Sequence, residues 1–263
     1  GKPLPHHQRR HSLQGTKNIV EMLHRQGRMH PSICEFVNRN YYNGGLDAVP
    51  LPHQQEPLAF GTRPDDDRWT AFVAGTRMAF ISVQADEAEY YTKIESKQEQ
   101  TKLAQGLPNV GDSSKSNKRE AETVARLIHT LCQLYSRSGI PFSPCKQIGI
   151  IVPFRAQIAM IRKALAERHI PDTADITIDT VERYQGSQRD IIIFSTTVSR
   201  PYQLSILSEP VMTDGREIDR KLNVALTRAR KQFFMTGNET LLRNCTAYRK
   251  FLDFLSKEQI LRL

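Results

Sequence analysis

The second half of the chain alternates short apolar runs with amphipathic segments, and this alternation limits the possible folds more than any other feature. Apolar runs at 148–152, 176–181, 190–197 and 232–236 each fit a strand, and residues 154–168 have helical spacing. The runs are apolar at nearly every position, as expected when both faces of a sheet are covered. Strands separated by helices require crossover connections. The sequence therefore predicts an α/β fold of three layers with a mostly parallel sheet.

The rest of the chain contributes further elements with weaker signals. Helical or strand spacing predicts a helix that starts at Pro31 and ends at Asn43-Gly44-Gly45, a strand at 78–83, a helix over 121–134, and two closing helices at about 238–244 and 246–258. We expect them to complete the layers around the parallel sheet.

The predicted organisation is an extended basic arm at 1–17 followed by one domain at 18–263. Within that domain, residues 47–75 are rich in Pro, Gly and charge and predict a surface excursion. Residues 93–117 have the polar composition of a mobile loop. We therefore expect a loop-rich insertion at about 47–117, which also holds the strand at 78–83.

Charge is concentrated towards the two ends of the chain. The formal net charge is +9. Residues 1–31 hold six Lys or Arg against one Asp or Glu, and residues 200–263 hold twelve against seven. Clustered basic residues favour a polyanionic partner, although many proteins are basic without one.

Cysteine spacing and hydropathy restrict the class of protein. The four cysteines lie far apart without a Cys-x-x-Cys pair, which argues against a zinc site and a disulfide framework. His6, His7 and His11 fit a solvated arm better than a metal site, so we predict no metal site. No apolar run approaches the ~18 residues of a membrane span, and no signal peptide is visible. We expect an intracellular protein without a membrane partner.

Two polar segments beside predicted strands are candidates for a ligand site. The first, 180–190, contains Gln185, Gly186 and Gln188; glycine allows close backbone approach, and the amides donate and accept hydrogen bonds. Because ligands collect at the carboxyl ends of parallel strands, we expect this loop to face a ligand there. A tight turn with polar decoration would explain the segment on its own.

The second segment, 221–230, reads as a short helix directly before the strand at 232–236. Its polar face carries Asn223, Thr227, Arg228 and Arg230, and charge on a helix is usually a solvated face. Arg228, however, lies in a frame of small apolar residues that would fix its position. A planar, permanently charged fork held in place suits a phosphate oxygen.

One acidic stretch resembles a magnesium site without its usual context. Residues 80–89 carry Asp86 and Glu87 directly after a predicted strand. Such a site requires a Gly-x-x-x-x-Gly-Lys-Ser/Thr loop upstream to hold the phosphates, and this sequence has none. We therefore interpret Asp86 and Glu87 as surface carboxylates.

Three blocks of sequence together resemble the second RecA-like domain of superfamily 1 helicases, in the branch of the nonsense-mediated-decay RNA helicase. The blocks are Gln26-Gly27-Arg28-Met29-His30-Pro31 with Tyr42-Asn43-Gly44-Gly45-Leu46, Thr180 to Asp190, and Leu222 to Arg230 ending at Gly237-Asn238. Weaker matches are Asn117 to Ala121 and Ile150 to Gln157. The likeness covers about residues 18–240 in the order of the family, and it implies a RecA-like fold that lacks its own phosphate loop.

The resemblance implies an ATP site between this domain and an N-terminal RecA-like domain of the same polypeptide, with Mg²⁺ held mainly by that domain. Arg228 matches the arginine finger of the family, and Arg28 matches a second arginine that reaches the γ-phosphate. Gln26, Gln185, Gly186 and Gln188 would line the nucleotide. Alone, the chain is expected to hydrolyse no ATP.

Two residues depart from the family pattern at this implied site. Gly27 stands where the family has a tyrosine that flanks the adenine, so one stacking surface is missing. Gln188 stands where the family has a glutamate that binds the ribose; it can still accept a hydrogen bond but carries no charge. Both changes concern nucleotide binding rather than the finger.

The resemblance also implies that single-stranded DNA or RNA crosses the domain. Thr180 and the turn Pro153-Phe154-Arg155 would face the strand. A hydroxyl and an arginine suit phosphates, and Phe154 either stacks on a base or packs under the following helix.

The leading hypothesis is therefore the C-terminal motor domain of an ATP-dependent helicase or translocase. The alternative is a non-catalytic module that binds nucleic acid or protein, with Gly27 and Gln188 as signs of decay. Retention of Arg28 and Arg228 argues against that alternative. A stand-alone nucleotide-binding protein is disfavoured because the phosphate loop is missing.

Overall fold

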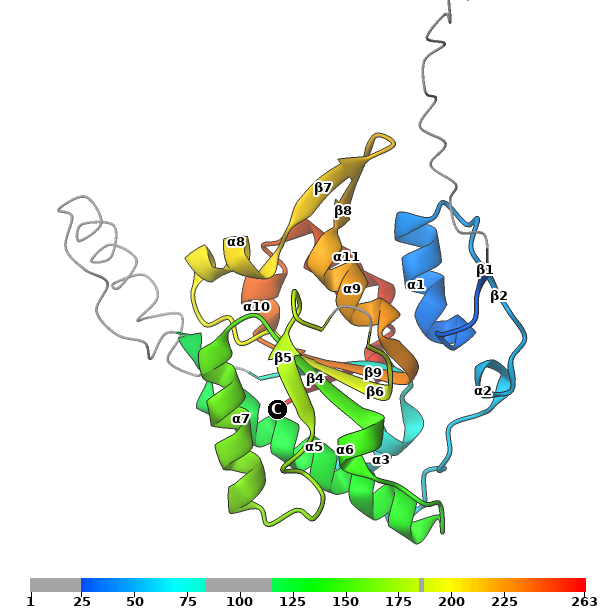
Figure 1. Cartoon of the computed structure of the whole chain (residues 1–263), viewed down its shortest axis with the longest axis vertical. Helices are drawn as coiled ribbons and strands as arrows, with labels where there is room; N and C mark the ends of the chain where they lie inside the picture. Colours follow the sequence, from blue (N-terminus) through cyan, green and yellow to red (C-terminus); the bar gives the residue numbers. More distant parts are fainter. Residues whose placement is uncertain (1–24, 84–114, 185–186) are drawn as a thin grey trace, which may run out of the picture.

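A parallel sheet of six strands forms the centre of the described chain (Figure 1). The computed structural model describes residues 25–83, 115–184 and 187–263. The strand order is β10-β3-β9-β6-β4-β5, and every neighbouring pair runs parallel. The strands are β3 (Met78–Ser82), β4 (Ile148–Val152), β5 (Thr177–Thr180), β6 (Arg189–Ser195), β9 (Ala229–Gly237) and β10 (Ile260–Arg262). The predicted α/β fold is confirmed.

Two helical layers cover the sheet, one on each face. The first layer contains α3 (Arg68–Gly75), α5 (Lys118–Arg137), α6 (Pro144–Gln147) and α7 (Arg155–Glu167); the second contains α1 (Pro31–Tyr41), α8 (Leu204–Leu207), α9 (Arg220–Thr227), α10 (Glu239–Leu242) and α11 (Thr246–Phe254). Successive strand residues alternate between the two cores: in β4, Ile150 packs under the first layer and Ile151 under the second. Both residues are fully buried, which explains why the strands are apolar throughout.

Residues 47–75 are more ordered than the predicted surface excursion. After the short strand β2 (Asp47–Ala48, paired with β1, Arg25–Gln26) and the helix α2 (Pro52–Gln55), the chain forms α3, so the prediction is wrong from Arg68 onward. The Asp67 side chain caps α3 by accepting from the Thr70 amide at 2.7 Å. Trp69 is buried and donates from its indole nitrogen to Thr130 Oγ1 on α5. Packing against α5 thus stabilises α3, although the local composition did not predict a helix.

The end of the chain also differs from the prediction of a helix over 246–258. Helix α11 ends at Phe254, a 3-10 turn η3 (Lys257–Gln259) follows, and β10 pairs with β3 at the edge of the sheet. The Gln259 side chain donates to the Met78 carbonyl at 2.9 Å and ties this turn to the start of β3. Three residues form a strand here because β3 offers a free edge.

An unpredicted hairpin precedes α9. Strands β7 (Pro210–Thr213) and β8 (Arg216–Asp219) pair antiparallel and extend away from the sheet (Figure 1). They follow α8 and the 3-10 turn η2 (Pro201–Gln203). Asp214 and Gly215 both have positive φ in the turn, 49° and 75°. An Asp-Gly pair is a recognised hairpin signal, so this element could have been predicted.

The segment after β5 crosses one face of the sheet to reach β6. Because β5 and β6 are both parallel to β4, the chain must return from the carboxyl end of β5 to the amino end of β6. Tyr184, on this path, is buried over Gly149 of β4: a Cβ on Gly149 would lie 1.8 Å from the Tyr184 hydroxyl oxygen. Glycine in the middle of β4 therefore makes room for the crossing segment.

Several predictions fall on residues outside the described ranges. These are the arm at 1–17, the carboxylates Asp86 and Glu87, most of the mobile loop at 93–117, and the candidate site residues Gln185 and Gly186. Among the described helices, none combines the length and apolar character needed to cross a lipid bilayer.

Candidate functional site

Arg28 lies in the turn between β1 and α1 and reaches two distant segments. Its Nη1 donates to the Thr227 carbonyl at 3.0 Å, and its Nε donates to Gln188 Oε1 at 3.0 Å. The Gln26 side chain shapes the turn by accepting from the amides of Arg28 and Met29, at 3.0 and 2.7 Å. Gln26, Arg28 and Gln188, which the sequence assigned to one site, are thus in direct contact.

Arg228 lies beside Arg28 at the C-terminal end of α9. It follows Thr227, whose carbonyl binds Arg28, and it is half-buried. Burial lowers the pKa of the Arg228 guanidinium, and the charge of Arg28 lowers it further. Its Nε is buried without a hydrogen-bond partner within the described ranges. Two like charges and an unused donor in one place fit an anion such as a phosphate group.

This arginine pair lies at the edge of the sheet opposite to the one we predicted. Gln188 directly precedes β6 and Arg228 directly precedes β9, so both lie at the amino ends of parallel strands. The prediction placed the ligand at the carboxyl ends because the 180–190 segment was read as one loop. That segment instead crosses the sheet, so Thr180 lies at the carboxyl edge and Gln188 at the amino edge.

The helix expected to carry both Arg228 and Arg230 ends before them. Helix α9 stops at Thr227, and Arg230 belongs to β9. The Arg230 Nη1 donates to Asp190 Oδ1 at 3.0 Å, and its side chain is about one third exposed. Arg230 is therefore neutralised by Asp190, whereas Arg228 forms no ion pair with the residues that the structure describes.

His53 is a further member of the site that the sequence did not indicate. Its Nε2 lies 2.8 Å from the Arg28 carbonyl, and its Nδ1 lies 3.5 Å from Arg230 Nη2. Because an arginine can only donate, Nδ1 accepts, and Nε2 carries the proton donated to Arg28. His53 thus buttresses the Arg28 turn from α2, and its distance along the chain left no local signal.

Gly27, the first departure from the family pattern, lies against Leu51. A Cβ at position 27 would meet Leu51 Cδ1 at 3.1 Å, and Leu51 is 39% exposed. The surface beside Arg28 is therefore a partly exposed aliphatic side chain rather than an aromatic ring.

The candidate nucleic-acid residues lie together at the carboxyl edge. Thr180 ends β5, and Pro153 and Arg155 follow β4, which pairs with β5 as far as Val152 and Thr180. Arg155 is exposed and Thr180 half-buried. Phe154 is only 6% exposed, so in this conformation its ring packs inside the protein rather than facing a base.

A buried carboxylate organises the same edge. Glu120, fully buried near the start of α5, accepts from Ser195 Oγ at 2.8 Å, Thr236 Oγ1 at 2.7 Å and the Thr197 amide at 3.0 Å. Burial raises the pKa of Glu120 and these hydrogen bonds partly offset that effect, so that the pKa is about 7. Gln157 of α7 extends the network by donating to the Asn117 carbonyl at 3.1 Å. The ends of β6 and β9 and the start of α7 are thus fixed to one another.

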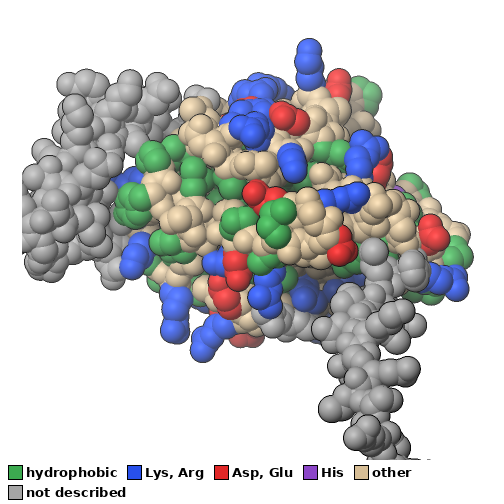
Figure 2. Space-filling model, turned by 90° about the horizontal axis from the view of Figure 1, so that it is seen from above, with side chains coloured by type: hydrophobic (Ala, Val, Ile, Leu, Met, Phe, Trp, Pro, Cys, Tyr) green, Lys and Arg blue, Asp and Glu red, His purple; other side chains and the backbone are tan. Residues whose placement is uncertain are grey.

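Neither the surface charge nor a group of metal ligands indicates a further binding site in the part of the chain that the structure describes. Figure 2 shows Lys and Arg side chains interspersed with acidic ones over one face rather than gathered in one stripe. Within the described ranges, no group of three or more His, Cys, Asp or Glu side chains is arranged to hold a metal ion.

The three-layer parallel sheet has the RecA-like arrangement, which defines the class of domain. A family model described as "AAA domain" matches residues 6–240. The chain therefore belongs to this AAA domain family, and its relatives show a superfamily 1 helicase domain of the nonsense-mediated-decay helicase branch.

Proteins from three organisms, two of them named as helicases, are similar to the chain. The DNA polymerase alpha-associated DNA helicase A of Saccharomyces cerevisiae is 29% identical over 234 residues, which covers 87% of this chain and 29% of that protein. The regulator of nonsense transcripts 1 homolog of Arabidopsis thaliana is 28% identical over 222 residues (82% and 14%). The DNA replication ATP-dependent helicase/nuclease DNA2 of Bos taurus is 26% identical over 265 residues (95% and 22%). The chain spans less than a third of each relative.

Proposed function

We propose that this domain is the second motor domain of an ATP-dependent helicase or translocase and that Arg28 and Arg228 bind the γ-phosphate of ATP. The observation that carries the proposal is the half-buried arginine pair, in which the Arg228 Nε has no partner among the described residues. A phosphate would supply the missing acceptor and neutralise two adjacent charges. ATP would lie between this edge and an N-terminal RecA-like domain, which would hold most of the Mg²⁺ coordination.

In this proposal each arginine has a separate task. The Arg28 guanidinium is held by Thr227 and Gln188, while His53 supports the Arg28 backbone carbonyl, so the guanidinium is already positioned before nucleotide binds. Arg228 keeps an unused donor for charge that develops in the transition state, as arginine fingers do. Gln188 would exchange its bond to Arg28 for a ribose hydroxyl.

The nucleic-acid strand would cross the opposite, carboxyl edge. An exposed Arg155 and the Thr180 hydroxyl support phosphate contacts there, and the Glu120 network gives the edge a fixed shape. Phe154, being buried, supports this edge from inside. The arrangement makes no distinction between DNA and RNA.

The test is the nucleic-acid-stimulated ATPase of the full-length protein. We expect Arg228→Ala to lower kcat by roughly 10³-fold or more, because fingers of this kind contribute ~10³ to 10⁵ in rate. Arg168→Ala, which removes an exposed arginine at the end of α7, is the matched control and should leave kcat unchanged. Unchanged ATPase in Arg228→Ala would reject the motor proposal and favour a non-catalytic binding module.

A further inference from the structure

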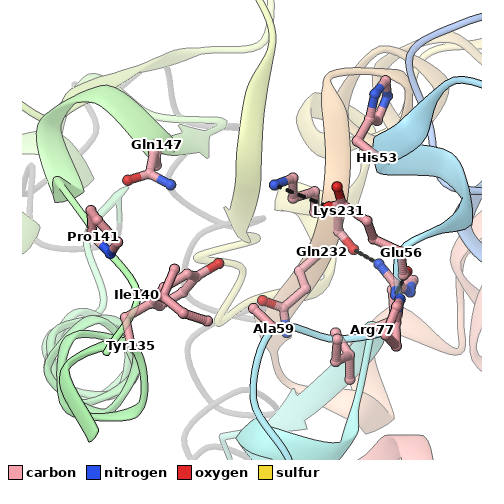
Figure 3. Close-up of a pocket in the computed structure, with 12 residues that line it drawn as sticks. His53, Glu56, Ala59, Arg77, Tyr135, Ile140, Pro141, Gln147, Lys231 and Gln232 are labelled. Atoms are coloured by element: carbon pink, nitrogen blue, oxygen red, sulfur yellow. Dashed lines mark hydrogen bonds and ion pairs between the residues drawn. The ribbon is translucent and has the colours of Figure 1, made fainter. Parts of the chain in front are cut away.

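A cavity opens at the amino edge of the sheet, and His53, which supports the Arg28 turn, is one of its lining residues. Its volume is about 450 Å³, within the usual range for small-molecule sites. Figure 3 shows two facing sides: Ile140, Pro141 and Gln147 on one, and Lys231, Gln232 and Ala59 on the other. Ile140 and Pro141 give the first side an apolar surface, and Pro57 and Leu58 of the loop after α2 also line the cavity. Apolar side chains beside polar groups suit a flat heteroaromatic ring.

Most polar groups around the cavity are already engaged within the protein. Arg77 donates from Nη1 to the Lys231 carbonyl at 2.8 Å and from Nη2 to the Glu56 carbonyl at 2.9 Å. The Gln147 side chain accepts from the Ser143 amide at 2.8 Å and donates to Asp190 at 3.3 Å. These bonds fix the Arg77 and Gln147 side chains in the cavity wall.

Three polar groups on the cavity wall are not engaged in this way. Gln232 is 2% exposed and donates from Nε2 to the Thr76 carbonyl, but its Oε1 accepts no hydrogen bond from the described residues. Tyr135 is 4% exposed and lines the cavity. Its hydroxyl forms no hydrogen bond with any residue in the described ranges. The Lys231 ammonium lies 3.7 Å from Glu56 and 3.9 Å from Asp190, too far for hydrogen bonds.

We propose that this cavity binds a nucleobase, as a separate site from the arginine pair. A nucleobase is flat, and its apolar face suits the Ile140 and Pro141 side of the cavity. Its edge carries an N–H donor for Gln232 Oε1 and acceptors for Lys231 and the Tyr135 hydroxyl. A phosphate is disfavoured as the main determinant, because the Lys231 ammonium lies between the carboxylates of Glu56 and Asp190. Free nucleosides should therefore bind as well as nucleotides.

Occupancy should also influence the arginine pair. His53 lines the cavity and contacts the Arg28 carbonyl, so one side chain is shared between the two sites. The base could come from a free nucleoside or from a nucleic-acid strand. The carboxyl edge, where we propose that the strand crosses, is the opposite end of the sheet, so the free nucleoside is the expected source.

The test is calorimetric titration of the full-length protein with adenosine, guanosine, cytidine and uridine, and separately with a single-stranded oligonucleotide. We expect at least one nucleoside to bind with a dissociation constant below 1 mM, the level at which a weak site is still measurable. Tyr135→Phe and Lys231→Met should each weaken it by roughly threefold to tenfold, the effect of losing one hydrogen bond. Tyr42→Phe, which removes a phenolic hydroxyl at the end of α1, is the control and should change nothing.

The same titrations separate this site from the proposed ATP site. Binding that persists in Arg228→Ala supports an independent cavity, whatever that variant does to the ATPase. Binding lost in Arg228→Ala, binding unaffected by both cavity variants, or no nucleoside binding below 1 mM would each overturn the proposal. Binding of the oligonucleotide alone, sensitive to Tyr135→Phe, would overturn the free nucleoside as the source.

Discussion

Arg28 and Thr227 are 199 positions apart in the sequence, yet the Arg28 Nη1 donates to the Thr227 carbonyl at 3.0 Å. This bond joins the turn before α1 to the end of α9 and sets the two arginines side by side. Because Arg228 follows Thr227, we expect substitutions at Arg28 to disturb the residue that we propose as the finger as well.

Substitutions at Arg28 should distinguish its charge from its geometry. Arg28→Lys keeps the charge but cannot bind Thr227 and Gln188 through one planar fork. We expect kcat of the nucleic-acid-stimulated ATPase to fall roughly tenfold to hundredfold in Arg28→Lys, and further in Arg28→Ala. Steady-state kinetics of both variants would check this, and equal activities in the two would show that geometry alone matters.

Arg155 should contribute one phosphate contact at the carboxyl edge. We expect Arg155→Ala to weaken binding of single-stranded nucleic acid and to reduce the slope of log affinity against log salt by about 1. Fluorescence anisotropy with a labelled oligonucleotide over a salt series measures both quantities. Arg168→Ala removes an arginine from the other end of α7 and should leave the slope unchanged. An unaltered slope in Arg155→Ala would place the strand elsewhere.

Gly149 should tolerate no side chain. In Gly149→Ala the new Cβ would lie 1.8 Å from the Tyr184 hydroxyl oxygen and 2.7 Å from Tyr184 Cζ, so the crossing segment must move. We expect a loss of about 1–3 kcal/mol in the free energy of unfolding, or more. Gly75→Ala, whose Cβ would make an ordinary 3.4 Å contact, is the control and should change stability little. Urea unfolding of both variants compares them directly, and equal stabilities would contradict the packing described.

Glu120 should contribute far more to the free energy of unfolding than Glu122, a surface glutamate on the same helix. Glu120→Gln replaces an acceptor by an amide whose NH₂ faces donors from Ser195, Thr236 or Thr197. We expect a loss of about 3 kcal/mol or more, since each buried donor left unpaired costs about 1–3 kcal/mol. Glu122→Gln affects only an exposed pair with Lys118 at 3.8 Å and should cost less than about 0.5 kcal/mol. Similar midpoints for the two variants in denaturant would be inconsistent with this network.

His30 should make stability fall in mild acid. Burial lowers its pKa from 6.5 to about 4, with smaller effects of the charges of Arg77 and His53. The neutral ring accepts from the Ser32 amide at 3.2 Å at the start of α1. Between about pH 6.5 and 4 the unfolded chain binds a proton that the folded protein does not, so this contribution to stability falls as the pH is lowered.

The check is urea unfolding at several pH values, with His30→Asn as the comparison. Asparagine keeps a capping acceptor but does not titrate. The difference in unfolding free energy between wild type and variant should therefore change over this pH window and be constant above it. A difference that is independent of pH would show that His30 does not carry the effect.

Elements that are defined by their own residues were predictable. Local hydrophobic spacing predicts the strand at 148–152 and the helix at 121–134, and the structure confirms both. Helix α3 and strand β10 were missed because their stability comes from distant partners, the face of α5 and the edge of β3. The hairpin at Asp214-Gly215 was a missed local signal.

The candidate site also contains residues that local motifs predicted and residues that only distant contacts place there. The motifs predicted Arg28, Gln188 and Arg228, and the structure places the three together. His53 could not be found, because its contact with Arg28 depends on how α2 folds back. The edge was misassigned because a sequence does not show whether a loop stays at one end of a sheet or crosses it.

Tyr184 packs on Gly149 in the middle of β4, four residues after Thr180, which ends β5. A single glycine inside the sheet is therefore also a determinant of its carboxyl edge. We expect a side chain at position 149 to disturb the place where we propose that the nucleic-acid strand crosses, although Gly149 itself is far from any surface that a strand could touch.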